Sequence, residues 1–177
     1  HGAAEVAAVL MEPNAGTNGI VAPENYWPLL RAHTRERGVY LIADEVMSGF
    51  GRCGEWFAWQ RDGEDGRPDL MTLAKGLTGA HLPLGAVVMS ADIARRLENE
   101  MLYTGLTYCG HPLSCAAGVA AIEAYEGEGL IERTDVDEMR DRSEHANVAG
   151  REDALVRTRI GKSERPPEGQ DAIGVEL

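Results

Sequence analysis

Lysine is scarce in this sequence. Two of the 17 basic residues are lysines, Lys75 and Lys162, and the other 15 are arginines. Aromatic residues make up only 6% of the chain, and the three cysteines lack the paired spacing that metal sites use, so no metal is expected. A small, odd number of cysteines argues against a disulfide scaffold and favours a reducing, cytoplasmic setting.

Long apolar runs and an excess of positive charge are also missing. No run approaches the roughly 20 residues that a membrane-spanning helix needs, so we expect no membrane partner. The net charge is −12, and such a chain has nothing to neutralise the phosphates of nucleic acid. What is present, 177 residues with 44% hydrophobic content, is enough for an ordinary α/β domain with a buried core.

The order of apolar and amphipathic segments predicts a parallel sheet covered by helices. A strand–helix–strand order with apolar strands is typical of such sheets. The expected strands are 5–12, 39–46, 70–74 and 83–90, and the expected helices are 23–38, 91–100 and one that begins near 112. The strand at 39–46 is apolar enough to be buried on both faces. Ligands bind beyond the carboxyl ends of such strands, where Glu12, Asp44 and Lys75 fall.

Asp44 and Val46 form an unusual pair in the second expected strand. Side chains alternate along a strand, so these two point to one face and Glu45 points to the other. A carboxylate beside a branched apolar side chain suits an aromatic heterocycle, because the acid can bind a protonated ring nitrogen while Val46 packs on the ring. The alternative is that Asp44 or Glu45 caps the following turn, since a buried charge needs a partner.

Lys75 stands alone in the apolar run LMTLAKGLTGA, residues 70–80. A desolvated lysine becomes a nucleophilic amine that forms imines with carbonyl groups. The alternative is a lysine whose ammonium group reaches the surface from a strand end. Ala74, Gly76 and Gly79 leave room for a bulky adduct. An imine-forming lysine and an acid for a pyridinium nitrogen are what proteins supply to pyridoxal phosphate.

Four sequence blocks carry a resemblance to a known family. They are MEPNAGTNGIVAPENYW, LIADEVMSGFGRCGEWFA, PDLMTLAKGLTGAHLPLGAVV and GLTYCGHPLSCAAG. Their order and spacing over residues 6–131 resemble the class III (omega-type) aminotransferases. The resemblance implies an α/β fold that is part of the fold-type-I large domain, with pyridoxal 5'-phosphate as cofactor. It also implies transfer of an amino group from an amino acid or amine to a 2-oxo acid.

The resemblance assigns roles to four residues. Lys75 matches the lysine that forms the internal aldimine, a Schiff base, and then shuttles a proton between substrate and cofactor. Asp44 matches the acid that keeps the pyridine nitrogen protonated, and Val46 matches the residue packed against the ring. Thr107 matches the threonine that reaches the cofactor phosphate of the neighbouring subunit, which implies a homodimer.

Two departures from the family pattern bear on the substrate. Thr17 stands where ornithine- and 4-aminobutyrate-type members typically carry a glutamate, and Met47 stands where they often carry a glutamine. Both features favour pyruvate or alanine as the acceptor–donor partner, similar to omega-amino-acid–pyruvate and taurine–pyruvate aminotransferases.

The resemblance also divides the chain into two parts. Residues 1–133 are expected to form the carboxyl-terminal part of the large domain, and residues 134–177 a divergent, truncated start of the small domain. Members of the family are more than twice as long, and their upstream half supplies a phosphate loop that this chain lacks. We therefore expect the isolated chain to bind the cofactor weakly, to turn over little and to associate through exposed apolar surface.

Two alternatives to transamination follow from the same residues. An aminomutase or a decarboxylating relative would share Lys75, Asp44 and the scaffold. A non-catalytic remnant, which only folds or associates, is favoured by the divergent tail. Cofactor binding separates the remnant from the enzymes, and product analysis separates the enzymes from one another.

Overall fold

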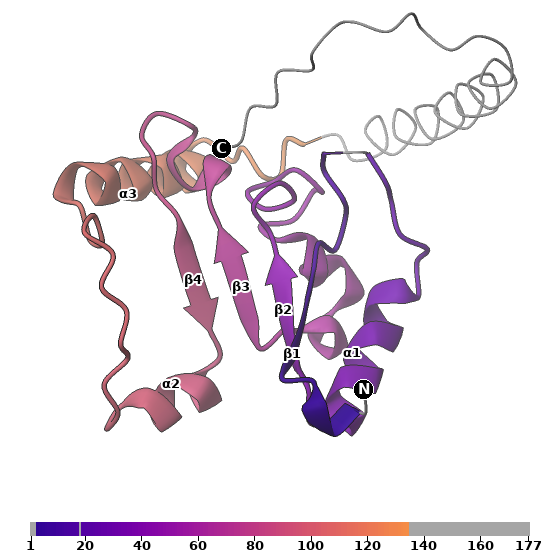
Figure 1. Cartoon of the computed structure of the whole chain (residues 1–177). Helices are drawn as coiled ribbons and strands as arrows, with labels where there is room; N and C mark the ends of the chain where they lie inside the picture. Colours follow the sequence, from indigo (N-terminus) through magenta and orange to yellow (C-terminus); the bar gives the residue numbers. More distant parts are fainter. Residues whose placement is uncertain (1–2, 18, 135–177) are drawn as a thin grey trace, which may run out of the picture.

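The computed structural model of the chain describes residues 3–17 and 19–134. Within this part, four strands form one sheet in the order β1-β2-β3-β4. They are β1 (Ala8–Met11), β2 (Tyr40–Asp44), β3 (Leu70–Leu73) and β4 (Ala86–Met89). The first three run parallel and β4 runs antiparallel to β3, as the arrows in Figure 1 show. The mostly parallel sheet is thus confirmed.

Three α-helices accompany these strands: α1 (Tyr26–Glu36), α2 (Ala91–Leu97) and α3 (Pro112–Gly127). Short 3-10 turns complete the set: η1 (Ala3–Glu5), η2 (Ala58–Asp62), η3 (Glu64–Gly66) and η4 (Lys75–Thr78). Proline fits the first position of α3, and the Ser114 amide donates to Nδ1 of His111 just before it, over 3.5 Å. In Figure 1, α3 lies near the carboxyl end of β3, and α2 lies at the opposite end of the sheet.

Helix α1 and turn η2 cover one face of the sheet and form the core. Trp27 of α1 and Trp59 of η2 pack against Leu41 and Ala43, which are fully buried on β2. Each indole also satisfies its polar atom: Trp27 donates to the Gly66 carbonyl over 2.8 Å, and Trp59 donates to the sulfur of a methionine on β3 over 3.0 Å. This core fixes the position of β2, and with it the start of the next turn.

The other face of the sheet is open within the described part of the chain. Leu10 and Val87 on that face are 57% and 58% exposed, and Tyr40 is exposed as well. The expectation that β2 is buried on both faces is therefore wrong for the described residues, whose helices cover one face of the sheet and leave the other open. Because side chains alternate along β2, Asp44 points to the open face, opposite the core.

Two sequence-based expectations concern the small-domain segment and membrane-spanning helices. Apart from Thr134, the segment assigned to the small domain, 134–177, lies outside the described residues. In the described ranges, no helix is both long enough and apolar enough to cross a membrane.

Candidate active site

Two predicted site residues lie at the same edge of the sheet. Asp44 is the last residue of β2, and its register partner on β3 is Thr72. Lys75 follows Thr72 by three residues and lies just past the end of β3. Parallel neighbours lie about 4.8 Å apart, so the ends of β2 and β3 bring both side chains to the same carboxyl edge. The placement expected from the sequence is confirmed for these two residues.

Lys75 has an unusual backbone conformation. Its φ is +43°, in the left-handed region that residues other than glycine seldom adopt, and such strain gathers at functional sites. Its side chain is exposed, and its ammonium group has no hydrogen-bond or ion-pair partner among the described residues. The premise that this lysine is desolvated is therefore not met by the described residues. An exposed, unpaired amine remains available to a ligand.

The geometry expected for Asp44 and Val46 is wrong in one respect. β2 ends at Asp44, so Val46 lies in the following turn and not on the same strand face. The cause is local: the Val46 amide donates to Oδ1 of Asp44 over 3.1 Å, a side-chain bond that competes with the strand ladder. Both residues are half-buried, and the second oxygen of Asp44 has no partner within the described part of the chain.

Glu45 is the residue that ties the turn together. It is fully buried, and its carboxylate accepts hydrogen bonds from the Ser48 hydroxyl (2.5 Å) and the Ala58 and Trp59 amides (both 3.0 Å). Burial is the main cause that raises its pKa above the ordinary value; these hydrogen bonds lower it in part, and the nearby Asp44 charge raises it further. The sequence analysis considers Glu45 only as a possible cap of the following turn. The signal for its larger role is a charged residue directly before a glycine-rich loop.

The loop after β1 packs against the same turn. A Cβ on Gly16 would lie 2.4 Å from Cβ of Met47, so only glycine fits there, and Asn14 donates to the sulfur of Cys53 over 3.2 Å. Thr17, the next residue, is exposed. The two departures considered for acceptor choice, Thr17 and Met47, therefore lie on touching loops.

Thr107 is not joined to the other predicted site residues within the described chain. It is exposed and lies in the segment between α2 and α3, which runs alongside the sheet in Figure 1. No hydrogen bond among the described residues connects it to Asp44 or Lys75. Its expected role concerns a neighbouring subunit, which this single chain does not test.

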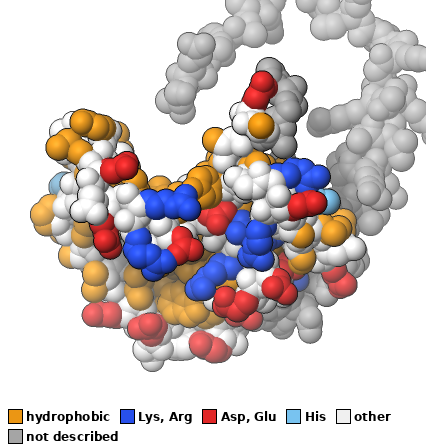
Figure 2. All heavy atoms as spheres, turned by 90° about the horizontal axis from the view of Figure 1, so that it is seen from below, with side chains coloured by type: hydrophobic (Ala, Val, Ile, Leu, Met, Phe, Trp, Pro, Cys, Tyr) orange, Lys and Arg blue, Asp and Glu red, His pale blue; other side chains and the backbone are white. Residues whose placement is uncertain are grey.

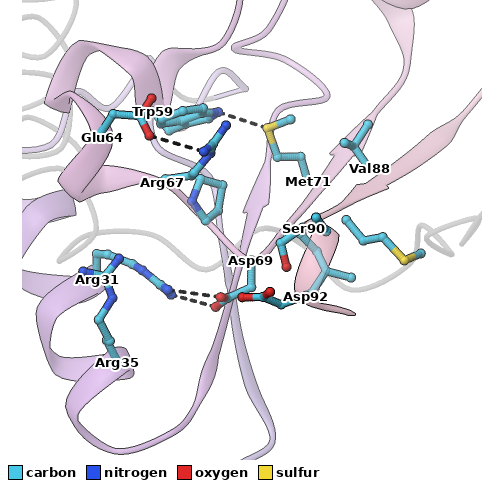
Figure 3. A pocket seen from close by; sticks show the side chains of 14 residues that line it. Arg31, Arg35, Trp59, Glu64, Arg67, Asp69, Met71, Val88, Ser90 and Asp92 are labelled. Atoms are coloured by element: carbon cyan, nitrogen blue, oxygen red, sulfur yellow. Dashed lines mark hydrogen bonds and ion pairs between the residues drawn. The ribbon is translucent and has the colours of Figure 1, made fainter. Parts of the chain in front are cut away.

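A cleft of about 590 Å³ lies at the opposite end of the strands. Figure 2 views the molecule from that side and shows basic and acidic side chains interleaved there. In Figure 3, Arg31 and Asp69 point toward each other; their bonds measure 2.6 and 3.1 Å, and Asp69 also accepts the Leu41 amide over 2.8 Å. None of the predicted site residues lines this cleft, so we interpret this ion pair as a structural tie.

Pyridoxal phosphate fits the chemistry at the carboxyl edge. An amine without a partner and a carboxylate with a free oxygen face one edge of the sheet, and these are the groups that its aldehyde and ring nitrogen require. Among the residues that the structure describes, no three His, Cys, Asp or Glu side chains gather in a way that could hold a metal ion.

Comparison with known proteins identifies the family. The model of the family described as "Aminotransferase class-III" matches residues 1–145, most of the chain. The chain belongs to this family of pyridoxal-phosphate-dependent enzymes. A putrescine–pyruvate aminotransferase of Pseudomonas aeruginosa is 42% identical over 134 residues, which cover 75% of this chain and 29% of that protein.

Solved structures agree with the fold. An S-selective transaminase from Arthrobacter sp. matches with a TM-score of 0.71 and 42% identity, over 74% of this chain and 28% of that one. A taurine:2-oxoglutarate aminotransferase from Bifidobacterium kashiwanohense, in complex with pyridoxal phosphate and glutamate, matches with a TM-score of 0.70 and 46% identity, over 73% and 29%. The chain spans 27–31% of the length of the curated relatives compared.

Proposed function

We propose that the protein takes part in pyridoxal-phosphate-dependent transamination, with Lys75 as the amine that bonds to the cofactor. The observation that carries this proposal is the register of β2 on β3, which pairs Asp44 with a residue three positions before Lys75. Membership of the class-III aminotransferase family supports it. When bound, pyridoxal phosphate supplies an aldehyde that takes up the amino group and a ring that draws electrons from the substrate carbon.

The residues of this chain divide the work. Lys75 presents its Nζ at the end of β3, where it can bond to the aldehyde and later accept and return a proton at the substrate carbon. Asp44 would bind the ring nitrogen through its free carboxylate oxygen and would hold a proton there. Val46, whose amide is held by Asp44 in the turn after β2, would pack against the ring from that turn. Glu45 keeps the turn that carries both in place.

The scarcity of lysine makes the central assignment testable. Borohydride reduction in the presence of pyridoxal phosphate fixes the cofactor on the lysine to which it has bonded, and peptide mapping locates it. We expect the label on Lys75 and not on Lys162, with visible absorbance that is lost in Lys75→Ala and kept in Lys162→Ala. Labelling of neither lysine, or of both equally, would contradict the proposal. Product analysis then separates amino transfer from decarboxylation, which needs no acceptor.

Pyruvate is the acceptor that we propose. Thr17 and Met47 support this choice, because they replace the glutamate and glutamine of other members and lie on loops that touch through Gly16. Single-turnover measurements with the amine-loaded protein would compare acceptors without requiring repeated cycling. Faster decay of the amine-loaded spectrum with pyruvate than with 2-oxoglutarate is the expected result, and the reverse order would reject the assignment.

A homodimer is the assembly that we propose, with Thr107 reaching the cofactor phosphate of the neighbouring subunit. The support comes from the segment around it, where Tyr103, Leu106 and Tyr108 are 91%, 77% and 80% exposed. Large apolar side chains gathered on a surface mark sites of protein contact.

The cytoplasmic location stays a prediction from the cysteine content.

A further inference from the structure

Two non-glycine residues with left-handed backbones meet beside the candidate active site. Phe50, in the turn after β2, has a φ of +58°, and Lys75 has a φ of +43°. Residues keep such angles only where the surrounding contacts hold them. A Cβ on Gly76 would come within 2.8–3.0 Å of three side-chain atoms of Phe50. The two strained turns therefore touch each other, with glycine required at the point of contact.

Tyr125, on α3, joins this contact from a third element. Its hydroxyl donates to the Gly76 carbonyl over 2.9 Å, and no other side chain among the described residues hydrogen-bonds to the backbone of residues 75–76. Its ring stacks on that of Phe50, with 5.8 Å between ring centroids and 26° between planes, and Trp56 meets it edge-on at 6.0 Å. One side chain thus holds both strained turns.

The turn that begins with Lys75 has few bonds of its own. The Gly76 carbonyl accepts the Gly79 amide over 3.0 Å, and the Lys75 carbonyl accepts the Ala80 amide over 3.0 Å. The hydroxyl of Tyr125 is the one side-chain bond that reaches these carbonyls from outside η4, within the described part of the chain. Helix α3 therefore influences the direction in which Lys75 leaves β3.

We infer that Tyr125 is a positioning residue for Lys75. Its hydroxyl and ring keep the Lys75–Gly76 turn in the conformation that presents the amine at the carboxyl edge of the sheet. The inference deepens the proposed function and rests on it for the role of the amine. A tyrosine that merely packs α3 onto the sheet would affect stability alone, so the two possibilities differ in what they predict for Lys75.

The test compares Tyr125→Phe, which removes only the hydroxyl, with Tyr103→Phe, whose exposed hydroxyl has no hydrogen-bond partner in the described residues. Two measurements need no cofactor: hydrogen exchange of the Gly79 and Ala80 amides, and the rate of acylation of Lys75 relative to Lys162 at one pH. In Tyr125→Phe we expect exchange about fivefold faster, the factor that corresponds to one ordinary hydrogen bond. We also expect the ratio of Lys75 to Lys162 acylation to change, because the turn that presents the amine is loosened, and we expect neither change in Tyr103→Phe.

The outcomes are distinguishable. A lower unfolding midpoint in Tyr125→Phe, with amide exchange and the acylation ratio of Lys75 to Lys162 unchanged, would overturn the inference and leave Tyr125 a packing residue. Equal changes in Tyr103→Phe would overturn it as well. If borohydride labels no lysine in the unsubstituted protein, the proposed function fails; exchange and acylation then still decide whether Tyr125 holds the turn.

Discussion

The turn that follows β2 and the segment between α2 and α3 are built in opposite ways. Residues 45–59 fold around a fully buried carboxylate, Glu45, and Phe50 and Phe57 meet edge-to-face at 5.7 Å. The segment of residues 101–108 instead presents Tyr103 and Leu106 to solvent. The first follows a strand and the second follows a helix, and only the first satisfies its side chains within the described chain. The carboxyl edge can therefore be tested in this chain alone, whereas the exposed segment bears on the proposed homodimer.

Removal of the buried carboxylate should have the largest effect. Glu45→Ala leaves the Ala58 and Trp59 amides and the Ser48 hydroxyl without their acceptor. Hydrogen bonds to charged groups are individually strong, so we expect the free energy of unfolding to fall by about 3 kcal/mol. Urea unfolding measures it. The exposed Glu55→Ala is the matched control, and a similar loss in that variant would show that Glu45 has no special role.

A pair of glycine substitutions compares the two regions directly. Gly76→Ala places a methyl group against Phe50 at 2.8–3.0 Å, whereas a methyl group on Gly105 meets nothing within 4 Å. We expect the first to lower the free energy of unfolding by about 2 kcal/mol through overpacking. The second should change it by no more than about 0.5 kcal/mol. Equal losses in the free energy of unfolding of the two variants, measured with urea, would show that the two regions are packed alike.

The raised pKa of Glu45 predicts a pH dependence of stability. Its folded pKa lies above its unfolded value of about 4.5, mainly because of burial. Between these two pKa values the folded state binds more protons, so the stability from this group is present below pH 4.5 and is lost as the pH rises through the folded pKa. As the pH rises through this window, the free energy of unfolding should fall less steeply in Glu45→Gln than in the unsubstituted protein. Burial also raises the pKa of Asp62, but Asp62 is present in both proteins and its contribution to the pH dependence cancels. An unchanged slope in Glu45→Gln would therefore contradict the role given to Glu45.

The smallest effect on folding is expected in the exposed segment. Leu106→Ser removes an apolar side chain that is mostly in solvent, so the free energy of unfolding should change by no more than about 0.5 kcal/mol. Self-association, measured by sedimentation, should nevertheless weaken, because the substitution removes apolar contact surface. Leu29→Ser on α1, also exposed, is the control and should leave association unchanged. Equal weakening in both would point to general stickiness and not to this segment.

Individual residues show how far the sequence can be interpreted. Asp44 and Lys75 were placed correctly at the carboxyl ends of β2 and β3, because strands and their ends follow from local apolar pattern. Val46 was misplaced, because the Asp44 side chain ends the strand early by accepting the Val46 amide. The role of Glu45 was missed, because its partners at 58 and 59 return to it only after a long loop.

The sequence by itself determined the order of strands and helices, the family and the two residues that define the candidate site. The strands and helices follow from apolar periodicity, whereas the family and the two residues follow from the resemblance of four sequence blocks to known members. Only the tertiary structure decided that one sheet face is open among the described residues, that Lys75 is exposed in a left-handed turn, and that Tyr125 contacts that turn from α3. The physical reason is that local pattern fixes which side chains alternate or recur, whereas strain, exposure and long-range hydrogen bonds depend on which distant segments meet.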